Sequence, residues 1–131
     1  MKRTTEKEIE AVLRLDGPAR FSHFIKRVVD SEMAWGLWRD GWALMASDDG
    51  RQVFPIWPAR EYAALCKVDS WSDYETEEIR LQDLVNELLP RLRSHDVIPG
   101  VFPTPGGKGV MPTVEELISA LKEEGEKYGK F

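Results

Sequence analysis

The chain has 131 residues, a net charge of −5 and one cysteine, Cys66. A chain of this length forms one domain with its own core, so we expect residues 1–131 to be a single domain. The 18 basic and 23 acidic residues form no basic stripe, which argues against nucleic acid as a partner. There is no signal peptide and no apolar run of ~18 residues, so we expect a cytoplasmic protein without membrane association.

Two N-terminal segments have the apolar spacing of helices. Thr5 and Glu8 fit a capping box at the start of the first helix. The second starts near Gly17 and has apolar residues at i, i+3, i+4, i+7 and i+8. These residues are Phe21, Phe24, Ile25, Val28 and Val29. We expect this stripe to be buried against a sheet.

Residues 35–56 predict a three-stranded antiparallel meander. Asp-Gly pairs at residues 40–41 and 49–50 each separate two apolar runs, and Asp-Gly is typical of a two-residue hairpin turn. Two such turns place Leu37 opposite Leu44, while a bulge at residues 48–50 would shift the third strand by one. Both faces of this sheet are apolar, so helices or a partner should cover each of them.

The second half of the chain alternates helices with short strands. The expected elements are a helix over residues 58–67, an acidic loop over 69–78, a helix from Leu81 interrupted by Pro90, a strand over 97–102, a short fifth strand at Val110 and a capped helix from Thr113. The predicted fold class is α+β: a four- to five-stranded, mainly antiparallel sheet around a central meander, with helices packed on it.

Two apolar runs end in prolines, VFPIWP at residues 53–58 and VFPTP at residues 101–105. In this chain they accompany further short motifs, and together these resemble a family of small bacterial proteins catalogued as domain of unknown function 2750. The further motifs are Trp35-Gly36-Leu37, Gly41-Trp42-Ala43-Leu44, Glu61-Tyr62-Ala63 and Leu89-Pro90-Arg91-Leu92. The resemblance implies a bacterial source. It implies no established activity and supplies no catalytic residues.

The residues that carry chemistry do not form a catalytic or metal-binding motif. His23 and His95 lack further ligands at metal-site spacing, so we expect no metal and no cofactor. Cys66 could act as a nucleophile only beside a histidine, and a lone cysteine on a helix is more typical of a small buried side chain. The glycine-rich segment around Lys108 fails the phosphate-loop pattern and indicates a turn.

The tryptophans supply the candidate binding residues. Trp38 and Trp42 flank one turn, and Trp57 lies between two prolines, which is more than a core requires. We expect the two proline-terminated strand ends to bring Trp57 and Phe102 together at one sheet edge as an apolar centre. The expected charged rim of this patch is Arg60, Glu61 and Lys108.

These features favour a non-enzymatic protein-interaction module with an unidentified protein partner. The acidic segment 69–78 is either solvated surface or a site that attracts a basic partner. One alternative is an immunity-type protein that blocks a toxin. Another is a small enzyme with a pocket near Cys66, Arg60 and Glu61. A deep pocket of converging titratable groups would favour an enzyme, and an exposed apolar patch with a polar rim would favour the module. The oligomeric state is left open.

Overall fold

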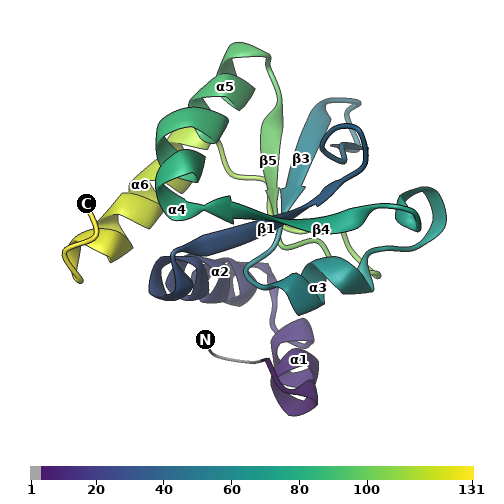
Figure 1. Ribbon diagram of the computed structural model, residues 1–131, viewed down its shortest axis with the longest axis horizontal. Coiled ribbons are helices and arrows are strands. Elements are labelled where there is room, and N and C mark those ends of the chain that lie inside the picture. Colours follow the sequence, from purple (N-terminus) through teal and green to yellow (C-terminus); the bar gives the residue numbers. More distant parts are fainter. Residues whose placement is uncertain (1–3) are drawn as a thin grey trace.

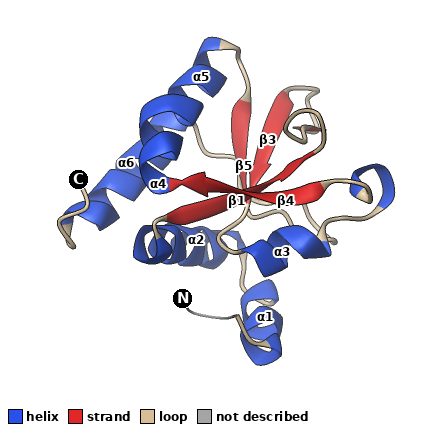
Figure 2. Ribbon diagram, in the orientation of Figure 1, coloured by secondary structure: helices blue, strands red, loops and turns tan. Residues whose placement is uncertain are grey.

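Residues 4–131 are described by a computed structural model, which is α+β with two small sheets (Figures 1 and 2). The first sheet pairs β1 (Met33–Trp38) with β4 (Glu75–Arg80) in antiparallel orientation. The second has the order β2 (Met45–Ala46), β3 (Gln52–Ile56), β5 (Ile98–Val101). Trp35 and Trp57 join the two sheets by exchanging backbone hydrogen bonds of 2.9 and 2.8 Å.

Helices lie on both sides of the crossing sheets (Figure 2). They are α1 (Glu6–Leu13), α2 (Gly17–Ser31), α3 (Arg60–Leu65), a 3₁₀ turn (Asp69–Trp71), α4 (Leu81–Asp83), a π-helical segment (Leu84–Leu88), α5 (Leu89–Ser94) and α6 (Val114–Glu126). The predicted capping box at Thr113 is confirmed, since Thr113 and Glu116 bond each other's backbone. At Thr5 only the hydroxyl caps the helix, because the Glu8 carboxylate binds Arg27 instead, at 2.9 Å.

The apolar stripe of α2 is buried, as the spacing predicts. Phe24 and Val28 have no exposed surface, and Phe21 is half-buried at the start of the stripe. Pro90 was predicted to kink or end its helix, and it does not end it. A π-helical segment precedes the proline, with the Leu89 N–H donating to the Leu84 carbonyl, and Pro90 falls in the first turn of α5.

The predicted central meander is wrong at its first pair. The backbone of β1 bonds to residues 42–46 only through the Trp38–Trp42 bridge and the Ala43 N–H to the Leu37 carbonyl (2.8 Å), so of the three predicted strands β2 and β3 alone form a hairpin. Each turn contains one residue more than predicted. Asp40 (φ 56°) and Gly50 (φ 84°) adopt left-handed conformations, as in three-residue loops. The two-residue turn predicted at residues 49–50 is therefore wrong, and the third strand has the shifted register that a bulge at residues 48–50 would give.

The four- to five-stranded, mainly antiparallel sheet is not formed. Two small sheets replace it, and β5 runs parallel to β3. The short strand predicted at Val110 is absent, since Val110 makes only a single bridge to Val101. Much of the predicted acidic loop is the strand β4. Its side chains are mostly charged and exposed, with only Ile79 buried, so the apolar periodicity that marks a strand is missing.

Candidate functional site

The two proline-terminated strand ends lie side by side, as predicted, but they are buried. β3 and β5 are parallel neighbours, and the Phe102 N–H donates to the Ile56 carbonyl at 2.8 Å. The Trp57 indole N–H donates to the Pro103 carbonyl, also at 2.8 Å. Trp57 and Phe102 are each 0% exposed, so they belong to the core and do not form an exposed binding patch. With its only polar group bonded, the indole can be enclosed completely by the core.

The predicted charged rim is dispersed. Arg60 is exposed and Glu61 half-buried in the first turn of α3. Lys108 binds the Asp48 carboxylate (2.7 Å) and the Ala46 carbonyl (3.3 Å), so it fastens the glycine-rich turn to the β2–β3 hairpin. Within residues 4–131 no hydrogen bond or ion pair joins Lys108 to the start of α3.

Cys66 is a poor candidate nucleophile. Burial raises the pKa of its thiol to about 11, so the thiol is protonated at neutral pH. The Sγ atom lies 3.6 Å from the Pro103 carbonyl. His95 Nδ1 is 2.9 Å from the Arg91 carbonyl, and the His23 ring packs near Phe102. The described part of the chain contains no group of three or more His, Cys, Asp or Glu residues that could hold a metal ion.

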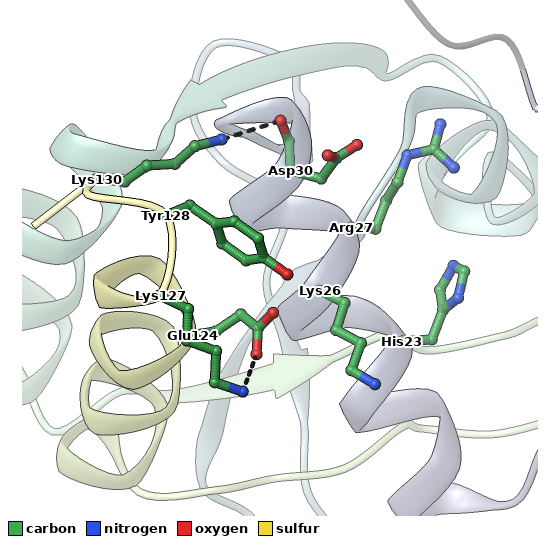
Figure 3. Close-up of a pocket in the computed structure, with 8 residues that line it drawn as sticks. All are labelled: His23, Lys26, Arg27, Asp30, Glu124, Lys127, Tyr128 and Lys130. Atoms are coloured by element: carbon green, nitrogen blue, oxygen red, sulfur yellow. Dashed lines mark hydrogen bonds and ion pairs between the residues drawn. The ribbon is translucent and has the colours of Figure 1, made fainter.

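A charged cleft of about 580 Å³ lies between α2 and the C-terminal segment (Figure 3). Its charges are largely neutralised by local partners. Lys127 binds Glu124 at 3.1 Å, Arg27 is held by an ion pair to α1, and Lys130 donates to the Val29 carbonyl at 2.7 Å near the end of α2. Of these contacts, the Lys130 hydrogen bond fastens the C-terminal segment to α2, the Arg27 ion pair joins α2 to α1, and the Lys127 ion pair lies within the C-terminal segment.

An exposed tryptophan lies at the first turn, apart from the exposed aromatic residues of the C-terminal segment, Tyr128 and Phe131. Trp38 is 41% exposed, and its ring packs edge-to-face against Trp42, with 5.1 Å between the ring centroids. Trp42 in turn rests on Phe54 and on Gly36, where an added Cβ would lie 2.8 Å from the indole ring. Trp38 therefore projects from a packed base rather than from a loose loop.

The β1–β4 register places carboxylates beside these rings. Glu75 pairs with Trp38, and Glu77 pairs with Gly36, over which the Trp42 ring lies. Directly opposed residues of an antiparallel pair point to the same face, so both glutamates share a face with the indoles. Both are exposed, and neither forms an ion pair with any other residue from 4 to 131. We call Trp38, Trp42, Glu75 and Glu77 the Trp38 face.

The sequence singled out the tryptophan pair and the acidic segment separately, but it did not bring them together. Their contact depends on the pairing of β4 with β1, across a separation of more than thirty residues. The available signal was weak: Thr76 and Ile79 are the only β-branched residues within β4.

A family model described as protein of unknown function (DUF2750) matches residues 21–121. The chain belongs to the DUF2750 family. The DUF2750 match runs from α2 into α6, so it includes both the buried corner formed by Trp57 and Phe102 and the Trp38 face. It confirms the resemblance inferred from the motifs. Searches of curated proteins and of solved structures give no match. No helix within residues 4–131 is long and apolar enough to cross a membrane.

Proposed function

We propose that this DUF2750 protein is a non-enzymatic interaction module of the bacterial cytoplasm that binds a basic segment of a partner protein at the Trp38 face. The observation that carries the proposal is the position of two unpaired carboxylates, Glu75 and Glu77, beside the exposed ring of Trp38. The surface thus offers both an aromatic ring and negative charge to the same ligand group.

Lysine and arginine side chains satisfy both parts of this surface. A cation over an indole ring gains about 0.5–1 kcal/mol at an exposed site and about 2 kcal/mol when water is excluded. Each exposed carboxylate adds up to about 1 kcal/mol. Trp38 is held by Trp42, so it loses little freedom when a partner covers it, which suits a binding hot spot.

The alternatives named from the sequence are less well supported. The enzyme hypothesis relied on Cys66 with Arg60 and Glu61, and the raised pKa of the buried thiol argues against it. A toxin-blocking role is one case of the present proposal, because it requires only that the toxin presents a basic segment.

The proposal is tested by selecting, from a displayed library of short random peptides, those that bind the folded protein. Enriched peptides should be rich in lysine and arginine, and they should lose binding to Trp38→Ala and to the Glu75→Gln/Glu77→Gln double variant. Leu65→Ala removes an apolar side chain of matched exposure (39%) from α3, and Glu10→Gln removes an exposed charge from α1. Both controls should bind normally. Enrichment without basic residues, or equal binding to Trp38→Ala, would contradict the proposal.

A further inference from the structure

Among the described residues, 4–131, the strand β4 is hydrogen-bonded to a neighbouring strand along one edge, that of β1 (Figure 1). It is six residues long, and the sheet it forms with β1 has two strands. Exposed side chains occur on both of its faces, Glu77 on one and Glu78 on the other, and no strand within residues 4–131 pairs with its second edge. An open edge offers a row of backbone N–H and C=O groups to another extended chain.

The charges on β4 decide what kind of chain can pair there. Glu75, Glu77 and Glu78 are all exposed. A second copy of β4 in parallel register would place carboxylates opposite carboxylates, and the antiparallel register that sets Glu75 opposite Arg80 would still set Glu77 opposite Glu78, which opposes pairing. A strand carrying lysine or arginine would place cations opposite them. The edge thus discourages self-association and favours a basic partner.

We propose that the partner segment binds as an added β-strand along the free edge of β4, with basic residues at alternate positions. This inference rests on the proposed function and specifies its geometry. Neighbouring strands lie about 4.8 Å apart, so a residue opposite Glu75 on the added strand is about 10 Å from the backbone of Trp38. Its side chain extends over Glu75 toward the indole. The intervening residues point to the opposite face, so the basic residues that meet Glu75 and Glu77 fall at alternate positions.

Backbone N-methylation separates strand addition from other modes of binding. Alternate residues of an added strand direct their N–H groups toward β4, and the residues between them direct theirs to solvent. The probe is a short peptide of alternating lysine and valine. Two further peptides carry N-methyl groups on one or the other alternate set of residues, with identical side chains and charge.

One of the two methylated peptides should bind at least about tenfold more weakly than the unmodified peptide, since several hydrogen bonds are lost, and the other should bind almost as well. Amide hydrogen exchange of β4 should slow when the unmodified peptide is added. If both methylated peptides bind like the parent while Trp38→Ala abolishes binding, strand addition is wrong and the proposed function stands. If the lysine peptide binds no better than one with glutamate in place of lysine, both proposals are wrong.

Discussion

Two tryptophan-bearing regions of this protein have similar sequence contexts but differ in burial. Trp38 is the last residue of β1 and precedes a turn, and Trp57 directly follows β3 and lies beside prolines. Trp57 is 0% exposed and its indole N–H is bonded to the Pro103 carbonyl, whereas Trp38 is 41% exposed and packs edge-on against Trp42. The difference lies in the neighbouring strands: β5 runs beside the proline corner and closes it, while the first turn projects past the edge of β1. Strand neighbours, rather than residue type, decide whether an aromatic residue is core or surface.

The largest effect expected from this comparison is on stability. Trp57→Ala should lower the free energy of unfolding by about 3–5 kcal/mol, as truncations of buried aromatic residues do. Trp38→Ala should cost less than about 1 kcal/mol because its ring is partly solvated already. Denaturant unfolding of both variants measures the two values. Similar losses would mean that the two tryptophans do not belong to different environments.

The base of the Trp38 face can be tested at Gly36. Gly36→Ala places a Cβ 2.8 Å from the Trp42 ring, so Trp42 must move, at a cost of about 1–3 kcal/mol. Gly41→Ala is the matched control, because an added Cβ there meets nothing within 4 Å. Unfolding curves and near-ultraviolet circular dichroism report stability and ring packing. An unperturbed Gly36→Ala spectrum would show that Trp42 does not rest on this strand.

Alkaline pH should lower the free energy of unfolding through two buried groups, Cys66 and Tyr62. Burial raises the pKa of Cys66 from 9.0 to about 11 and that of Tyr62 from 10.0 to about 12. The folded state therefore holds protons that the unfolded state has lost, so stability is full below pH 9 and falls as pH rises through about 11. We expect a decrease of about 1–3 kcal/mol, measured by denaturant unfolding at several pH values.

Cys66→Ala separates the thiol contribution from that of the Tyr62 hydroxyl. Its stability should begin to fall at a higher pH than that of the unaltered chain, because only the tyrosine then resists ionisation. A pH profile unchanged by the substitution would contradict the burial argument for the thiol.

The smallest expected effect concerns Lys108. Its ion pair with Asp48 is exposed on both sides, with side-chain exposures of 49% and 95%. Lys108→Gln should therefore change the free energy of unfolding by less than about 0.5 kcal/mol. It should also leave peptide binding intact, since Lys108 is not part of the Trp38 face. A large loss of binding would indicate that the functional surface is the patch around Trp57, Phe102 and Lys108 that the sequence predicted.

Local signals in the sequence predicted the local structure well. The apolar stripe of α2, the Thr113 capping box and the β2–β3 hairpin each depend on residues close together in the chain, and each is confirmed. The pairing of β1 with β4 and the parallel alignment of β5 with β3 depend on distant residues, and no local pattern specifies them.

The candidate site was predicted in the same partial way. Trp38 was identified from its place beside a turn, but the importance of Glu75 and Glu77 depends on strand register. Trp57 and Phe102 were correctly expected to approach each other, because matched apolar runs suit adjacent strands. Their burial depends on β5 and on the elements packed around the corner, which a sequence pattern of this length does not encode.

The most direct test of the central claim is the affinity of a lysine-rich peptide for the intact protein, for two variants of the Trp38 face and for one control variant. Trp38→Ala should weaken binding by about thirtyfold, corresponding to about 2 kcal/mol at a hot spot. Glu75→Gln/Glu77→Gln should weaken binding and reduce its dependence on salt, while Glu10→Gln should do neither. Equal affinities for all of these proteins would contradict the account and show that the Trp38 face is not where a basic partner binds.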